Sequence, residues 1–272
     1  MKLAVSSIAW NKEEEAAAAE LLASMGVKYV EVAPTKVWDE PIEATDDAIE
    51  AYRQWWLEYG IEVVAFQSML FTHPDYMLFD DEATRERSIQ YLQDFTRLAG
   101  KMGAKRLVFG SPRNRQKGEL STEAANMIAV DVFDRIGTVA KEVGVIFCIE
   151  PNAPQYNCDF VTNAAEGIAM VDSVANEGFG LHLDAACMTL AGDDLGESIR
   201  TAGEHIKHFH ISSPMLESVN AEAEVAHATA AAALKDIDYQ GYVSIEMKPS
   251  ADESNIERLK TAVLFAQSVY AD

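Results

Sequence analysis

The chain contains few cysteines and few basic residues. Its 272 residues include three cysteines, and no two of them have CxxC spacing, so the sequence indicates neither a zinc knuckle nor a disulfide framework. The 22 Lys and Arg residues are outnumbered by 44 Asp and Glu residues, which gives a formal net charge of -22. Because a phosphate backbone or an anionic lipid surface repels such a protein, we expect no nucleic-acid or membrane partner.

Long apolar runs and nucleotide-binding motifs are also missing. No apolar run approaches the length of a membrane span, and the opening MKLAVSSIAW is too short and too polar for a signal peptide. We therefore expect a cytoplasmic protein. No GxGxxG motif follows the first apolar segment, which makes a dinucleotide-binding fold a weaker interpretation.

Short apolar segments alternate with longer amphipathic segments along the whole chain. The apolar segments read LAVSSIAW, YVEVAP, VVAFQS, RLVFGSP, IFCIEPN, FGLHLDAA, IKHFHIS and YVSIEMKP. A glycine stands at most joints between a helical segment and the next strand, as in MGVKYV and MGAKRL. Eight such units without a break in composition predict an α/β fold, a single (β/α)8 TIM barrel over residues 1–272. A doubly wound open sheet is the alternative.

Helices are expected between these strands. The seventh unit is the weakest, with a polar loop, Ser212–Glu224, before a short Ala-rich helix. The predicted helices are Asn11–Met25, Thr45–Tyr59, Glu82–Met102, Thr122–Val143, Asn163–Asn176, Ala226–Lys235 and Ser254–Tyr270.

Four consecutive apolar segments end on a side chain that can bind a metal ion. These residues are Glu150, Asp184, His210 and Glu246. In a barrel the carboxyl ends of the strands converge, so the sequence predicts one site with three carboxylates and one imidazole. Such a donor set suits Mn2+, Mg2+ or Co2+, and Zn2+ is an alternative. An ion-pair belt without metal is the other interpretation, but only Lys248 lies near these residues in sequence.

The motifs SSIAW, VEVAP, IEPN, HLDA, HFHIS and GYVSIEM resemble the sugar phosphate isomerase/epimerase superfamily, the xylose isomerase-like TIM barrels. The resemblance covers essentially the whole chain. It implies that Glu150, Asp184, His210 and Glu246 bind a divalent metal, with Mn2+ favoured. It also implies that Glu150 and Glu246 act as the catalytic acid and base on opposite sides of a substrate.

The chain departs from the ketose epimerases of that family in two places. Those enzymes carry a histidine three residues after the aspartate ligand, where this chain has Cys187. They also carry an arginine just after the strand of the histidine ligand, where this chain reads HISSPML. Both departures count against a free-sugar 3-epimerase. Cys187 is either a soft contact in the site or a small packing residue.

Further strand-end residues are candidates for contacts with substrate. Gln67 follows the third strand, and its amide can donate and accept hydrogen bonds. Glu31 faces either the substrate or a structural partner such as Lys36. Arg113 and Arg115 either bind an anionic group of the substrate or lie in a solvated loop. The full set of substrate-binding candidates is Gln67, Arg113, Cys187, His182, Trp10 and Glu31.

The leading functional interpretation is a metal-dependent isomerase or epimerase of a small carbohydrate or hydroxy-keto compound. A dehydratase or lyase that uses the same base and metal is the first alternative, and a non-catalytic carbohydrate-binding barrel is the second. Six histidines and the negative charge argue against a relative of endonuclease IV, which needs more histidine ligands and a basic groove. The sequence allows a homodimer or a homotetramer.

Overall fold

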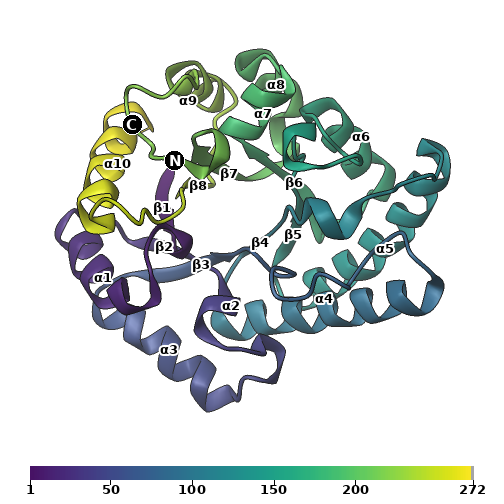
Figure 1. Ribbon diagram of the computed structural model, residues 1–272, viewed down its shortest axis with the longest axis horizontal. Coiled ribbons are helices and arrows are strands. Elements are labelled where there is room, and N and C mark those ends of the chain that lie inside the picture. The colour runs from purple at the N-terminus through teal and green to yellow at the C-terminus, as the bar shows by residue number, and fades with distance from the viewer. Residues whose placement is uncertain (271–272) are drawn as a thin grey trace.

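Short buried strands and amphipathic helices alternate along the chain, as the apolar segments predict (Figure 1). The computed structural model describes residues 1–270. Its strands are β1 (Lys2–Ser6), β2 (Tyr29–Val32), β3 (Glu62–Phe66), β4 (Arg106–Phe109), β5 (Ile146–Ile149), β6 (Phe179–Asp184), β7 (Ile206–Ser212) and β8 (Tyr242–Glu246). All strand pairs are parallel, and β8 pairs with β1, so the sheet closes. The predicted (β/α)8 barrel is confirmed, and the open sheet is wrong.

Helices surround this barrel on its outer side (Figure 1). They are α1 (Glu15–Ser24), α2 (Pro34–Val37), α3 (Asp46–Glu58), α4 (Glu82–Met102), α5 (Thr122–Glu142), α6 (Ala164–Val174), α7 (Ala185–Ala191), α8 (Leu195–Ala202), α9 (His227–Asp236) and α10 (Asn255–Tyr270). Single 3-10 turns lie in the loops: η1 (Ser7–Ala9), η2 (Lys12–Glu14), η3 (Pro41–Glu43), η4 (Pro112–Arg115), η5 (Pro154–Tyr156), η6 (Gly203–His205) and η7 (Pro214–Leu216). None of the described helices is long and apolar enough to cross a membrane.

Helix boundaries follow local capping chemistry. The Thr45 side chain accepts a hydrogen bond from the Ala48 amide at the start of α3, and Asn163 caps α6 in the same way. Gly103 ends α4 with φ 87°, a left-handed conformation that glycine adopts without strain. At the end of α6, however, Ala175 takes the left-handed conformation although it is not a glycine.

Two expectations about the elements were wrong. The first predicted strand continues to Trp10, but β1 ends at Ser6 and η1 follows. Helices α7 and α8 were not predicted. Both begin at an aspartate whose side chain accepts an amide hydrogen bond, Asp184 for α7 and Asp194 for α8. Both capping aspartates are visible in the sequence. Asp184 was interpreted only as the residue that ends a strand and not also as a helix cap.

The faces of the strands divide the core into two parts. Along β7, Phe209 and Ile211 alternate with His208, His210 and Ser212, and all five are buried. The apolar set faces the helices, where the rings of Phe109, Phe133, Phe147 and Phe179 form one contiguous cluster. The polar set faces the barrel interior, so the upper interior is polar rather than filled with branched aliphatic side chains.

Replacing Phe133 by Ala should lower the free energy of unfolding by about 3–5 kcal/mol. The ring is fully buried and stacks on Phe179 with 4.9 Å between the ring centres, so its removal leaves a cavity. Urea denaturation of both proteins measures this difference. Met127→Ala on the same helix, whose side chain is 76% exposed, should change the unfolding free energy by less than about 0.5 kcal/mol. Equal effects of the two substitutions would contradict the assigned core.

Candidate metal centre and substrate cavity

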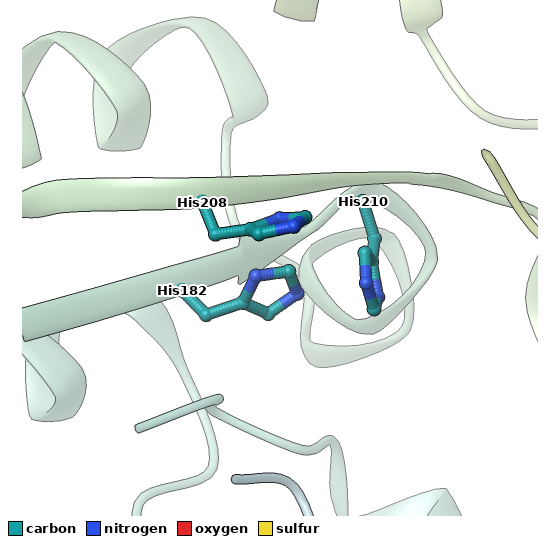
Figure 2. A group of neighbouring side chains, drawn as sticks. All are labelled: His182, His208 and His210. Atoms are coloured by element: carbon teal, nitrogen blue, oxygen red, sulfur yellow. The ribbon is translucent and has the colours of Figure 1, made fainter. Parts of the chain in front are cut away.

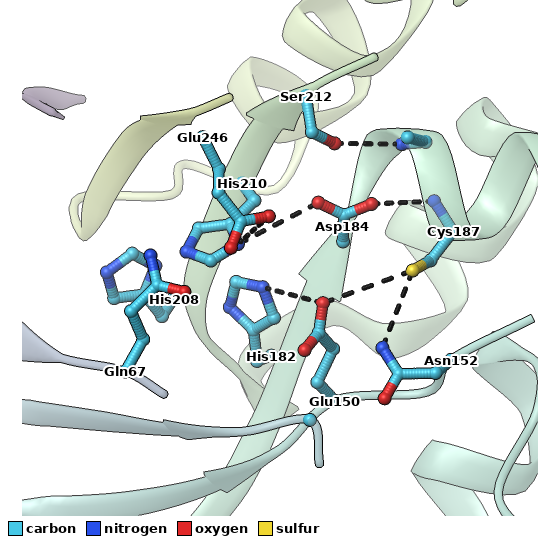
Figure 3. Close-up of polar contacts among 12 residues, drawn as sticks. Gln67, Glu150, Asn152, His182, Asp184, Cys187, His208, His210, Ser212 and Glu246 are labelled. Carbon is cyan, nitrogen blue, oxygen red and sulfur yellow. Dashed lines mark hydrogen bonds and ion pairs between the residues drawn. The ribbon is translucent and has the colours of Figure 1, made fainter. Parts of the chain in front are cut away.

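Three carboxylates and one imidazole meet at the carboxyl ends of β5 to β8 (Figure 3). Glu150 follows β5 directly, while Asp184, His210 and Glu246 lie on β6, β7 and β8. The pairing of the strands puts Asp184 beside His210 and Ser212 beside Glu246. All four side chains are buried. The structure thus brings together the four residues that the sequence predicts as metal ligands.

The distances between these side chains are short. His210 Nδ1 lies 3.2 Å from Glu246 Oε2 and 3.7 Å from Asp184 Oδ2. Ligand atoms of Glu150, His182, Asp184 and His210 all lie within 4.8 Å of one another. Among residues 1–270, neither Asp184 Oδ2 nor His210 Nδ1 has a hydrogen-bond partner. A buried carboxylate oxygen without a hydrogen-bond partner that faces an imidazole nitrogen is the arrangement expected of ligands to a shared cation.

The donor chemistry fits a divalent cation. Three carboxylate groups and one imidazole nitrogen suit Mn2+, Mg2+, Co2+ or Zn2+. Asp184 is fixed by its second oxygen, because Oδ1 accepts the Cys187 amide at 2.6 Å as the cap of α7. Ser212 Oγ accepts the Ala186 amide at 3.0 Å, which ties the start of α7 to β7. The first turn of α7 therefore aims Asp184 Oδ2 at His210.

Charge crowding shifts the acid–base equilibria of the site. Burial, followed by the charges of Glu246 and Asp184, raises the pKa of Glu150 to about 8. Burial and Glu246 also raise the pKa of Asp184. Burial alone would lower the pKa of His210, but the carboxylates of Glu31 and Glu246 raise it well above its ordinary value. The metal-free site thus reduces its excess negative charge by holding protons.

Three histidine rings lie close together in the barrel interior (Figure 2). His208 and His210 come from β7, and His182 comes from β6, with its ring centre 4.1 Å from that of His210. His182 Nε2 lies 3.9 Å from Glu150 Oε1. Burial, followed by the two neighbouring imidazoles, lowers the pKa of His182 well below its ordinary value. His182 is therefore a neutral ring where it contacts Glu150. It is fully buried in the barrel interior.

Glu31 makes a contact that the sequence did not reveal. Its carboxylate lies 3.0 and 3.1 Å from His210 Nε2 and 3.6 Å from His208 Nε2. The expected pair with Lys36 is wrong, since the Lys36 ammonium donates to the carbonyl oxygens of Ser7 and Trp10. Burial alone would raise the pKa of Glu31, but the His210 and His208 imidazoles hold it at about 2.

The expectation that Arg115 binds an anionic group of the substrate is wrong. Its guanidinium is fully buried and donates to the carbonyl oxygens of Gly110, Phe160 and Glu150 and to Asn152 Oδ1. The guanidinium thereby fixes the loop that carries Glu150. Arg113, on η4, is exposed and is not among the residues that line the cavity described below.

Cys187 and Asn152 lie on the β5–β6 side of the site. Cys187 Sγ lies 3.5 Å from Asn152 Nδ2 and 4.0 Å from Glu150 Oε1. Burial and the charges of Asp184 and Glu150 raise the pKa of the Cys187 thiol well above its ordinary value, so the group stays protonated. Asn152 was not predicted as a site residue, although it is the last letter of the IEPN motif.

A cavity of about 430 Å³ opens beside Glu246 at the mouth of the barrel. Its lining residues come mainly from the loops after β1, β2, β3 and β8, and they include Trp10, Gln67, Phe71, Glu246 and Lys248. Gln67 donates to Ser6 Oγ, and the Phe71 ring is 82% exposed. The cavity is large enough for a small carbohydrate, and it brings predicted substrate contacts and a predicted metal ligand to one place.

A Cβ atom at Gly110, directly after β4, would collide with Glu150 Oε2. A side chain at this position would therefore move the Glu150 carboxylate away from its place in the site. No pattern in the sequence identifies this role, since the contact joins two strand ends that are 40 residues apart.

Comparisons with known proteins agree with this architecture. An L-ribulose 3-epimerase from Methylomonas sp. (strain DH-1) is 24% identical over 245 residues, which cover 88% of this chain and 82% of the relative. The crystal structure of a D-psicose 3-epimerase with D-tagatose from Clostridium cellulolyticum H10 superposes with a TM-score of 0.83 at 20% identity, over 99% of each chain. The 3-keto-D-glucoside 4-epimerase YcjR of E. coli gives a TM-score of 0.82 at 16% identity, over 98% of this chain and 99% of that protein.

The model of one family matches most of the sequence. The match extends over residues 19–265, from within α1 to most of α10, and includes all four predicted ligands. The chain belongs to the xylose isomerase-like TIM barrel family.

Proposed function

We propose that this protein is a divalent-metal-dependent epimerase or isomerase that transfers a proton next to the carbonyl group of a small carbohydrate. The observation that carries the proposal is one buried cluster. His210 Nδ1 lies 3.2 Å from Glu246 Oε2 and 3.7 Å from Asp184 Oδ2, an oxygen without a hydrogen-bond partner among residues 1–270, and Glu150 lies beside them. The named activities of the relatives, which are epimerases of ketoses and of a keto-glucoside, support the same reaction type.

Glu150, Asp184, His210 and Glu246 would hold the cation. We propose Mn2+, with Mg2+, Co2+ and Zn2+ as alternatives for this donor set. When bound, a divalent cation polarises a carbonyl group and makes the neighbouring C–H bond more acidic.

Glu150 and Glu246 are proposed to move the proton. They lie at the ends of β5 and β8, strands that are not neighbours in the barrel, so they can reach a substrate from different sides. One carboxylate removes the proton from the carbon next to the carbonyl, and the other carboxylic acid returns a proton to the opposite face.

Residues of the cavity are proposed to hold the substrate. Gln67 can donate to or accept from sugar hydroxyl groups, and the face of Trp10 can pack against sugar C–H groups. Cys187 and His182 border Glu150 on the inner side and limit where its carboxylate can move. The exposed Arg113 would contact a substrate that extends out of the cavity.

Glu150→Gln and Glu246→Gln should each reduce proton exchange by at least about 100-fold, because an amide cannot take up the substrate proton. The measurement is deuterium incorporation from solvent into a panel of ketoses, keto acids, inososes and sugar phosphates, with metal content determined for each variant. Glu15→Gln is the matched control, since Glu15 is a half-buried carboxylate on α1 that accepts the Tyr52 hydroxyl at 2.7 Å. Undiminished exchange in either site variant would remove that glutamate from the acid–base role.

The same panel separates epimerisation from dehydration. An epimerase incorporates deuterium without a change in ultraviolet absorption, whereas a dehydratase releases water and generates an absorbing enone. Metal binding without exchange in any compound would instead favour a non-catalytic carbohydrate-binding barrel.

Metal affinity should rise with pH up to about pH 8. The raised pKa of Glu150, about 8, means that a cation must displace a proton at lower pH, and one displaced proton changes the dissociation constant about tenfold per pH unit. Titration calorimetry with Mn2+ from pH 6 to 9, in buffers of different ionisation enthalpy, measures both the affinity and the released protons. A pH-independent affinity would contradict a protonated Glu150 in the metal-free site.

The stability of the metal-free protein should change with pH in the opposite direction to the metal affinity. A carboxyl group whose folded-state pKa lies above its ordinary value of 4.5 contributes stability at low pH, which is lost as the pH rises from about 4.5 to 8. The unfolding midpoint of the metal-free protein should therefore fall across this window. Glu150→Gln should show a smaller fall, because the amide does not titrate.

A further inference from the structure

Glu31 connects opposite sides of the barrel. It lies on β2, its side chain is fully buried, and both of its oxygens lie within 3.1 Å of His210 Nε2 on β7. Strands β2 and β7 are not neighbours, since β1 and β8 lie between them. The contact therefore runs through the barrel interior, behind the four side chains of the proposed metal centre.

This contact decides which nitrogen of His210 carries the proton. A carboxylate can only accept a hydrogen bond, so the ring must donate Nε2–H to Glu31. A neutral imidazole with a proton on Nε2 presents its lone pair on Nδ1. That atom faces Asp184 Oδ2 at 3.7 Å and Glu246 Oε2 at 3.2 Å, where the proposed cation would lie.

We propose that Glu31 is a positioning residue that fixes the ring orientation and the tautomer of His210 for metal binding. The inference rests on the proposed function and extends it to a fifth residue. A negatively charged acceptor behind the ring also makes Nδ1 a stronger electron donor to a cation. Besides Glu31, the interior side of the barrel places His208 near the His210 ring. Its imidazole is neutral, so it would be a weaker acceptor for Nε2–H than the Glu31 carboxylate.

The surroundings of Glu31 favour a specific role over simple core packing. The register between β2 and β3 shifts between Val30 and Glu31, an irregularity of the kind that redirects a side chain near a functional site. The second oxygen of Glu31 also lies 3.6 Å from His208 Nε2, so one carboxylate contacts two imidazoles of β7. A fully buried carboxylate is strongly unfavourable unless it is paired in this way.

The experiment compares Glu31→Gln and Glu31→Leu with the wild type, using Zn2+ alone as a diamagnetic probe. Titration calorimetry gives the affinity, and nitrogen-15 NMR of the labelled histidine rings in the Zn2+-loaded protein reports the Nε2–H group of His210. Loss of an outer hydrogen-bond partner typically weakens metal binding 10–100-fold, so we expect about that loss for Glu31→Leu. Glu31→Gln should show a smaller loss, because its amide oxygen can still accept the hydrogen bond.

The NMR signal distinguishes positioning from general destabilisation. The Nε2–H resonance should shift in Glu31→Gln, since a neutral acceptor replaces a charged one, and it should broaden through exchange with water in Glu31→Leu. Glu15→Gln, which changes a carboxylate on the outer helix α1, should leave both affinity and resonance unchanged. The nearly isosteric Glu31→Gln carries the test if the leucine variant does not fold.

Two results would overturn the proposal, and they have different meanings. If the wild type binds Zn2+ tightly and Glu31→Gln binds it within about twofold with an unmoved Nε2–H resonance, Glu31 has no positioning role and the proposed function stands. If the wild type itself binds no divalent cation at the four residues, the proposed function fails together with the inference.

Discussion

The repulsion between buried carboxylates is the constraint on which the upper half of this barrel depends. Glu150, Asp184 and Glu246 are all buried around one imidazole, and Glu31 lies behind that ring. Desolvation and like charge both oppose ionisation, which is why the pKa of Glu150 rises to about 8 while the pKa of His210 rises well above its ordinary value. Protons satisfy this excess of charge in the metal-free protein, and a divalent cation would satisfy it better. Under the proposed function, the cation takes the place of these protons.

The alternation of side chains along the strands allows a polar site to exist inside a stable fold. On β7 the residues facing the helices are Phe209 and Ile211, and those facing the interior are His208, His210 and Ser212. Substituting the interior face hardly changes the apolar contacts of the outer face, because the two sets point in opposite directions. The outer layer can thus supply the hydrophobic stabilisation, while among residues 1–270 the interior tolerates the ring nitrogens of His182 and His208, which have no hydrogen-bond partner.

The sequence predicted the part of the site that depends on strand ends. Parallel strands converge at their carboxyl ends, so Glu150, Asp184, His210 and Glu246 could be placed together without knowing any distance. The eightfold barrel followed in the same way from the alternation of apolar and amphipathic segments. Both predictions use rules that act within one strand–helix unit, and such rules are visible in a linear pattern.

Contacts across the barrel could not be predicted in this way. Glu31 and His210 are 179 positions apart, and nothing near Glu31 in sequence indicates its partner, whereas Lys36 lies close in sequence but points elsewhere. Arg115 was misjudged for the same reason: its carbonyl acceptors belong to three separate segments that only the fold assembles. A buried arginine and a solvated one look alike in a linear sequence.

The two halves of the barrel therefore have different tasks. The proposed metal ligands come from β5 to β8, whereas the cavity is lined largely by the loops after β1 to β3, and Glu246 belongs to both groups. Cys187 stands where ketose epimerases of the family carry a substrate-contacting histidine, and its protonated thiol contacts Asn152 rather than the cavity. Under the proposed function, Trp10, Gln67 and the exposed ring of Phe71 line the cavity and would contact parts of a substrate beyond the carbons that react.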